Sequence, residues 1–452
     1  MRCFIFIIAA STATRLHPSW STIRARAGQP APRLFDARER LFGASQPEIV
    51  FWRDSAGWCP FCCMTWLLLE ELQLPYRIRT VPLRLYMLDG EQKDPEYIRQ
   101  VGPDGVIPGV QFLDDRSEGN FTSAVQSVEL IFKEIQDRYP EKFNQLQCLN
   151  ASIFAQACAG ERSVFGRLRV ARRTYKEFAD ADQVDASILD PDEALADLDL
   201  MLAQSGGPYL GGAKPSVADI MLLPFLERTE ALVPYFFGSS VLEALPFERA
   251  KILLEAARSQ PNFAFQALSS DATTLARTNL RYAIAGATPR YAVPSLDVDA
   301  DMAASIDGTS PATRHEWSAS ASLNARRDAA GRLAASPGKI AAFARRCAQL
   351  QSDKADRCSS EMLDDALRCV ACLLLTEDLG FGAGGNAVAQ LAEDAAEGLI
   401  CKHKNDSTHS AARVLEALSL NVGVPRDMDV QPARALRSYL RLFAGALRTA
   451  FD

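Results

Sequence analysis

Two cysteines lie where a predicted strand is followed by a predicted helix. Cys59 and Cys62 are spaced C-x-x-C, after the strand-like run of residues 48–53 and at the start of a helix-forming stretch that ends before Pro75. The unpaired N–H groups and partial positive charge of a helix N-terminus favour a thiolate over a thiol. Cys59 is therefore the predicted nucleophile. Cys62 follows one helical turn later, close enough to resolve a mixed disulfide on Cys59.

The same spacing also occurs in zinc sites and between inert buried cysteines. A zinc site needs a second pair of Cys or His ligands, and residues 64–147 contain neither residue type. Hydrolysis of the Cys–His kind needs a histidine base, and the four histidines all lie outside residues 47–284. We therefore expect redox or thiol-transfer chemistry at Cys59, and no metal.

The elements that must position this motif follow the order βαβαββα. Apolar runs predict strands at residues 48–53, 76–83, 110–113 and 120–122, and helical spacing predicts helices after Cys59, at 94–100 and at 124–138. Strand signals then give way to long helical patterns. One of these helices begins at Ser216, which can cap it while Asp219 reaches back. The fold class is thus an α/β domain followed by an all-α domain.

Together these motifs resemble a glutathione transferase over residues 47–284. The resemblance rests on the Cys-Pro-Phe-Cys helix start, on Val106-Ile107-Pro108 before the hairpin, and on the Ser-x-x-Asp box in the helical part. It implies a thioredoxin-like N-terminal domain. A cysteine at the active position resembles the omega, lambda and dehydroascorbate-reductase classes. The dithiol motif combined with a leader and a helical extension is most similar to the iota class of photosynthetic organisms.

The resemblance also implies where glutathione binds. In that family a proline matching Pro108 is cis, so that the backbone of the preceding residue, here Ile107, can pair with the cysteinyl group. The γ-glutamyl end is bound by an acidic residue and a serine ahead of the third helix. The matching pair here is Thr122 and Ser123, in which threonine replaces the acid. The predicted glutathione-binding residues are Trp58, Phe61, Ile107, Pro108, Thr122 and Ser123.

The chain is long enough for roughly three domains at about 150 residues each. The predicted parts are a leader at 1–45, the thioredoxin-like domain at 46–140, the helical transferase domain at 143–284, a linker at 286–322 and a mainly helical, Ala-rich extension at 323–452. The leader is expected to be disordered. Its short apolar start and acid-free, Arg-bearing remainder are typical of a signal followed by a transit segment. This predicts import into a plastid, with the secretory pathway and the cytoplasm as open alternatives.

The extension carries a second C-x-x-C pair, Cys369 and Cys372, within a mostly apolar stretch. Cysteines in such surroundings behave as small hydrophobes, so we expect both to be buried. The alternative is a metal set completed by Cys401, His403 and His409. The role of the extension stays open, and recruitment of a protein partner is one hypothesis.

The sequence thus predicts a glutathione-dependent thiol transferase or reductase, acting by deglutathionylation or by dehydroascorbate-type reduction. The acceptor is a small molecule or a protein disulfide, expected in a cleft lined by Trp58 and a basic helix. The alternatives are a non-catalytic ligand-binding protein and a dithiol reductase that does not use glutathione. A net charge of −7 without a Lys/Arg block argues against nucleic acid as a partner. The apolar run at residues 3–10 is too short to span a membrane. A homodimer is left open.

Overall fold

The computed structural model describes most of the chain and divides it into two compact units. One unit combines Met1–Pro32 with Pro294–Asp452, and the other is Arg33–Val293. The described residues are 18–30, 32–81, 95–101, 105–113, 121–146, 149, 151–168, 191–237, 247–271, 274, 275, 278, 322–351, 358–376, 385–403 and 407–450. The predicted linker at 286–322 lies outside them, apart from Ser322. Among the described helices, none has the length and apolar character needed to cross a membrane.

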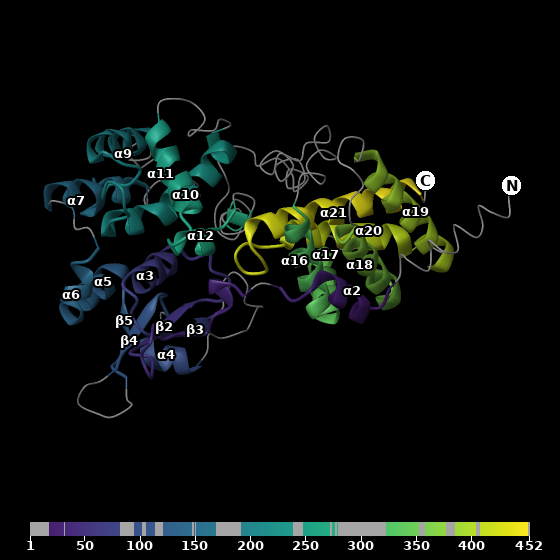
Figure 1. Cartoon of the computed structure of the whole chain (residues 1–452), viewed down its shortest axis with the longest axis horizontal. Helices are drawn as coiled ribbons and strands as arrows, with labels where there is room; N and C mark the ends of the chain where they lie inside the picture. The colour runs from purple at the N-terminus through teal and green to yellow at the C-terminus, as the bar shows by residue number, and fades with distance from the viewer. Residues whose placement is uncertain are drawn as a thin grey trace. The chain divides into compact units, whose positions relative to one another are not determined.

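A five-stranded mixed sheet forms the centre of the N-terminal half of the second unit (Figure 1). The strand order is β1-β3-β2-β4-β5, and only β2 and β3 among these neighbours run parallel. The strands are β1 (Glu39–Arg40), β2 (Ile49–Asp54), β3 (Tyr76–Val81), β4 (Gly109–Phe112) and β5 (Val125–Gln126). The helices are α3 (Pro60–Glu71), α4 (Pro95–Val101) and α5 (Val128–Arg138). The predicted order βαβαββα is confirmed from β2 to α5, and this is the thioredoxin-like arrangement.

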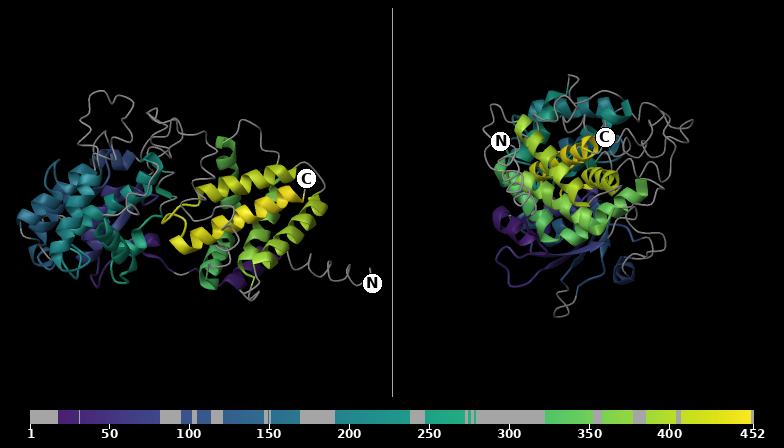
Figure 2. Two further views of the ribbon diagram at one scale, coloured as in Figure 1. Left: turned by 90° about the horizontal axis from the view of Figure 1, so that it is seen from above. Right: turned by 90° about the vertical axis from the view of Figure 1, so that its right-hand side faces the viewer.

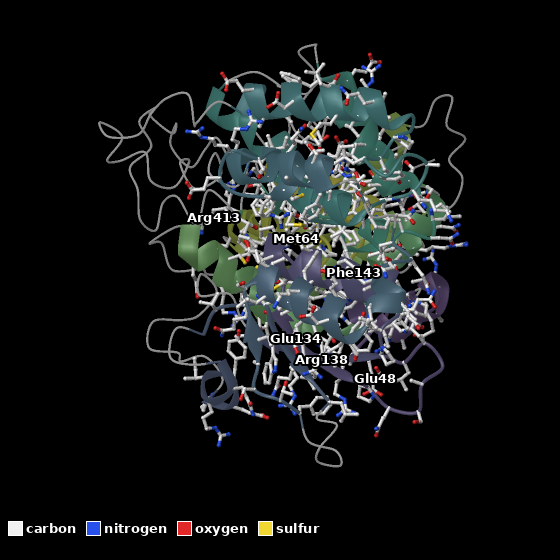
Figure 3. All side chains as sticks on the ribbon, turned by 90° about the vertical axis from the view of Figure 1, so that its left-hand side faces the viewer. Glu48, Met64, Glu134, Arg138, Phe143 and Arg413 are labelled. Carbon is white, nitrogen blue, oxygen red and sulfur yellow. The ribbon has the colours of Figure 1, made fainter. Side chains whose placement is uncertain are left out.

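The central strand β2 is buried along its whole length because both faces of the sheet are covered. Side chains alternate across a strand, so Phe51 packs toward α3 and α5, whereas Trp52 packs toward Tyr97 of α4. Met64 of α3 is fully buried, while Glu134 and Arg138 form an ion pair on α5 (Figure 3). The strand signals of residues 48–53 therefore reflect burial on two sides.

The hairpin that follows differs from the prediction. Residues 120–122 contribute only an isolated bridge, from Phe121 to Leu113, and the second strand of the hairpin is β5 at Val125–Gln126. Consequently α5 begins at Val128 rather than at residue 124. The cause is Ser127, whose side chain accepts the N–H of Leu130 and caps the helix there.

The helical half shares its hydrophobic core with α3 and α5. Its helices are α6 (Pro140–Phe143), α7 (Ala151–Cys158), α9 (Pro191–Ser205), α10 (Val217–Phe237), α11 (Glu248–Ser259) and α12 (Phe265–Leu268). The cap predicted at Ser216 is present, because the Asp219 carboxylate accepts the Ser216 N–H at 2.7 Å. Asp219 also accepts the N–H groups of Leu210 and Gly211 at 2.9 and 3.3 Å, which fixes the preceding turn.

The other unit is helical, as predicted for the extension. Its C-terminal helices are α16 (Leu323–Ala335), α17 (Pro337–Gln351), α18 (Ser360–Leu374), α19 (Gly385–His403), α20 (Ser407–Asn421) and α21 (Val430–Thr449). The apolar helix α18 forms the centre of the core, and α20 and α21 lie side by side (Figure 2). Cys369 and Cys372 are buried in this core, as expected.

Part of the predicted leader belongs to this helical unit. Residues expected to be disordered form α2 (Trp20–Ala27), which packs on α16 and α18. Ile23 is fully buried, and Trp20 Nε1 donates to Asp364 Oδ1 at 2.8 Å. Gly331 permits this approach, because a Cβ there would stand 3.3 Å from Pro30 Cγ. The expectation of disorder does not hold for α2, because its apolar partners lie far along the chain and leave no local signal.

The end of the predicted leader is also structured, within the other unit. Phe35 of η1 (Leu34–Asp36) packs against Trp66. The guanidinium carbon of Arg53 lies 4.5 Å from the centroid of the Phe35 ring. β1 adds an edge strand to β3.

We expect Ile23→Ala to destabilise the unit that contains α2. Replacing a fully buried Ile by Ala lowers the free energy of unfolding by about 2–5 kcal/mol. The measurement is chemical denaturation of the full chain, followed by hydrogen exchange to locate the loss in α16 and α18. Arg24→Ala, on the exposed side of α2, is the matched control. Unchanged protection of α16 and α18 in Ile23→Ala would contradict the packing of α2.

Candidate active site

The nucleophile predicted from sequence lies at the start of α3. Cys59 is the residue that precedes the first helical residue, Pro60, and its carbonyl accepts the Cys63 N–H at 3.0 Å. The loop from β2 turns at Gly57, where a φ of 74° is readily adopted only by glycine. The Cys59 side chain is partly exposed. The structure thus places the partly exposed Cys59 thiol at the positive end of a helix.

Cys62 faces inward, directly behind Cys59. Burial, followed by a side-chain hydrogen bond with Cys59, raises the pKa of Cys62 well above its usual value. A thiol that stays protonated can donate its hydrogen to a thiolate on Cys59, and this favours the charged form of Cys59. Burial raises the pKa of Cys63 as well, and its side chain packs in the core. The two cysteines of the motif therefore differ in exposure.

Asp54 holds the loop that carries Cys59. This carboxylate ends β2, is fully buried, and accepts the backbone N–H of Trp58 at 2.7 Å and that of Cys59 at 3.3 Å. The sequence-based prediction ended the strand at residue 53 and assigned no role to Asp54. The available signal was an aspartate at the end of a buried strand, five residues before the cysteine.

Trp58 and Phe61 are placed differently from each other. Trp58 is 6% exposed, so little of its side chain can reach a ligand. Phe61 is partly exposed and packs edge-on against Phe225 of α10, with ring centroids 5.4 Å apart. Of the two, Phe61 is the better placed to contact a bound molecule.

The Ile107–Pro108 peptide is cis, as the resemblance implies. Ile107 is partly buried and packs against both hydrophobic clusters that border the sheet. The preceding carbonyl, that of Val106, accepts hydrogen bonds from the Tyr97 hydroxyl at 2.5 Å and from Gln126 Nε2 at 3.2 Å. These contacts fix the segment that the resemblance assigns to the cysteinyl group of glutathione.

Thr122 and Ser123 do not lie at the start of the third helix. The Thr122 hydroxyl accepts the N–H of Phe112 at 3.1 Å and donates to the Ser123 carbonyl at 3.1 Å, so it closes the hairpin. The residues directly ahead of α5 are Gln126 and Ser127. Ser127 has a φ of 68°, a backbone conformation that is uncommon outside glycine and that redirects the chain here.

A cavity of about 580 Å³ lies between α5, α7 and α10. Cys59 is not among the residues that line it. Aromatic and aliphatic side chains such as Phe132, Phe154 and Met221 form most of its wall. Phe165 of this wall contacts Phe225, which in turn contacts Phe61 of the motif. No sequence pattern predicted this cavity.

The basic helix expected to line the acceptor cleft is only partly described. Arg167 forms an ion pair with Asp197 of α9. Arg169, Arg172 and Arg173 lie outside the described residues.

His403, one of the ligands considered for a metal in the extension, lies in a different set, with two carboxylates. Glu361, Asp365 and His403 lie close enough to share an ion. However, the Asp365 carboxylate is fully buried and already has partners. Its oxygen lies 2.5 Å from Lys402 Nζ and 2.8 Å from His403 Nε2, and the carboxylate also forms an ion pair with Arg368. A divalent cation would have to displace the positive groups of Lys402 and Arg368. Cys401 is exposed at the surface.

Known protein families match the part of the chain that contains Cys59 and the helical half. The family described as "Glutathione S-transferase, N-terminal domain" matches residues 58–125, and "Glutathione S-transferase, C-terminal domain" matches residues 181–264. This part of the chain belongs to the glutathione S-transferase superfamily. Both halves of the expected resemblance are thereby confirmed, and glutathione is the co-substrate of this superfamily.

The curated relatives are plant glutathione S-transferases. The Arabidopsis thaliana protein named probable glutathione S-transferase DHAR4 is 29% identical over 192 residues, which cover 42% of this chain and 77% of the relative. The chloroplastic glutathione S-transferase DHAR3 of the same plant is 25% identical over 197 residues, covering 44% and 65%. Among solved structures, Chlamydomonas reinhardtii dehydroascorbate reductase matches 53% of this chain and all of its own, at 20% identity and a TM-score of 0.39.

We expect a short pulse of iodoacetamide at pH 7 to modify Cys59 and the exposed Cys401, and to spare Cys62, Cys63 and Cys369. Burial raises the pKa of these three thiols, so that almost no thiolate is present, and also blocks access. Mass spectrometry of tryptic peptides measures each site. Labelling in denaturant, where all of them should react, is the control. Modification of Cys62 as fast as Cys59 would contradict the assignment.

Proposed function

We propose that this protein is a glutathione-dependent thiol transferase or reductase with Cys59 as its nucleophile. The observation that supports it most directly is the pair of thiols at the start of α3, one partly exposed and one buried and protonated behind it. A thiolate at Cys59 attacks the glutathionyl sulfur of a mixed disulfide and expels the acceptor thiolate, which takes up a proton. Cys59 is left as a mixed disulfide with glutathione.

Glutathione, rather than Cys62, completes the cycle in this proposal. The thiolate of a second glutathione attacks the glutathionyl sulfur on Cys59, which releases oxidised glutathione and regenerates the Cys59 thiolate. Cys62 would need to lose its proton to attack Cys59, and burial opposes that loss. For a dehydroascorbate-type acceptor, two glutathione molecules are oxidised to one disulfide, and the acceptor gains two electrons and two protons.

We further propose that Gln126 and Ser127, in place of Thr122 and Ser123, hold the γ-glutamyl end of glutathione. They directly precede α5, where the expected binding pair belongs, and Gln126 also contacts the carbonyl of Val106. The N-terminus of α5 favours the glutamyl carboxylate. Gln126 supplies a neutral amide oxygen to the ammonium group.

Plastid import remains our proposal for localisation, and the packing of α2 restricts it. Two of the relatives are named as chloroplastic. Removal of a leader after α2 would expose the buried surface that Ile23 covers. We therefore place any cleavage before Ser19, which caps α2.

The cavity supports a second candidate function, the binding of an apolar ligand without catalysis. Its volume and largely apolar wall are typical of small-molecule sites. The two candidates are distinguished by calorimetric titration with glutathione. Absence of binding at millimolar concentration would favour the ligand-binding protein over the transferase.

We expect Cys59→Ser to lower glutathione-dependent thiol transfer by at least about a hundredfold, because it removes the attacking sulfur. Cys62→Ser should stay within about fivefold of wild type, which corresponds to the loss of one hydrogen bond of about 1 kcal/mol. The assay is reduction of a glutathionylated peptide. Full activity of Cys59→Ser, or loss of activity in Cys62→Ser, would reject glutathione-resolved transfer.

We expect Gln126→Ala to raise KM for glutathione by about tenfold, the equivalent of one hydrogen bond to a charged group at about 1.5 kcal/mol. Thr122→Val is the control, because Thr122 closes the hairpin through Phe112 and does not precede α5. It should lower the melting temperature and leave KM unchanged. The reverse pattern would return the γ-glutamyl site to Thr122.

A further inference from the structure

The residue before the nucleophile is held by two different parts of the fold. Asp54 of β2 accepts the N–H of Trp58 at 2.7 Å, and Arg228 Nη2 of α10 donates to the carbonyl of Trp58 at 2.5 Å. The peptide groups on both sides of Trp58 are therefore fixed. Asp54 of the thioredoxin-like half holds the first, and Arg228 of the helical half holds the second. Arg228 comes from a position 170 residues later in the chain.

Arg228 is itself rigidly held. It is 3% exposed, and its Nη1 donates to the Pro224 carbonyl one turn earlier on α10, at 2.5 Å. Its guanidinium also lies 3.7 Å from the buried carboxylate of Glu227. A side chain with these contacts can fix the position of the Trp58 carbonyl.

Glu227 links Arg228 to a wider buried network. Glu227 accepts hydrogen bonds from Arg258 at 3.3 Å and from the Ser269 hydroxyl. Arg258 also pairs with Glu230 at 2.8 Å. Arg258 belongs to the same network as Arg228 but contacts Glu227, Glu230 and Ser269 rather than the Cys59 loop.

The charge of Arg228 acts on a thiol at the start of α3, that of Cys63. The Asp54 carboxylate binds the Cys59 N–H, and its negative charge opposes a thiolate there. Arg228 brings a positive charge to the carbonyl of the adjacent residue. The same guanidinium opposes the rise that burial causes in the pKa of Cys63, whose N–H is bonded to the Cys59 carbonyl. Arg228 therefore offsets the charge of Asp54.

We propose that Arg228 is a positioning residue for Cys59: it anchors the Trp58 carbonyl from the helical half and supplies the positive charge that keeps the Cys59 thiolate favourable beside Asp54. This inference rests on the proposed thiol-transfer function. It makes the reactivity of the thioredoxin-like half depend on one side chain of the helical half.

The test compares Arg228→Met with Arg258→Met in the full chain. The first readout is the pH profile of Cys59 alkylation by iodoacetamide, followed on the Cys59 peptide by mass spectrometry. The second readout is kcat and KM for thiol transfer. Arg228→Met should move the midpoint of the profile to higher pH by about one unit, which lowers alkylation below the midpoint about tenfold. It should lower kcat more than it raises KM.

Arg258→Met removes a cation from the same network and should leave the alkylation midpoint unchanged. Arg228→Lys keeps the charge and should return the midpoint toward wild type, although a single ammonium cannot hold the carbonyls of Trp58 and Pro224 in the same geometry. If Arg228→Met does not fold, Arg228→Gln removes the charge and keeps an amide N–H that can donate to a carbonyl. It should show the same shift in midpoint.

Equal midpoints for wild type and the folded Arg228 variants would overturn the role of Arg228 and leave the proposed function intact. Equal shifts in Arg228→Met and Arg258→Met would also overturn it, because a general loosening of the network would then explain both. Failure of the proposed function is different: wild type itself would show no thiol transfer and no reactive Cys59 at neutral pH.

Discussion

The buried carboxylate of Asp54 determines where α3 begins. By accepting the N–H groups of Trp58 and Cys59, it fixes the turn between β2 and the helix, so that Cys59 lies just outside the first turn and Cys62 just inside the core. The contrast between the two thiols follows from that placement. A shift of one residue in the register of α3 would rotate both side chains by about 100° about the helix axis and change their burial.

The thioredoxin-like and helical halves of the transferase unit form one hydrophobic core, and the proposed site draws residues from both. The first half contributes the cysteines, the cis Ile107–Pro108 segment and the start of α5. The second contributes the Arg228 anchor and the Phe225 ring against Phe61. Because packed interiors are rigid, a substitution on α10 can alter the reactivity of a sulfur that it does not touch.

The sequence was sufficient where the relevant contacts are local. The strand–turn–helix around Cys59, the cis Ile107–Pro108 bond implied by resemblance and the cap at Ser216 are all present. The start of α5 was misplaced by four residues, because Ser123 and Ser127 are both plausible caps and only the pairing of β5 with β4 decides between them. Asp54 and Arg228 were missed because their partners are backbone groups, which no side-chain pattern reveals.

The packing of α2 also has a consequence for the order of synthesis. Trp20 leaves the ribosome early among the described residues, yet its partner Asp364 follows 344 residues later. The transferase unit lies between them in the chain and can complete its core first, since domains fold as units during synthesis. Until α16 and α18 have been synthesised, α2 lacks the helices against which Ile23 is buried. The helical unit that joins α2 to the C-terminal helices is thus the second of the two units to assemble.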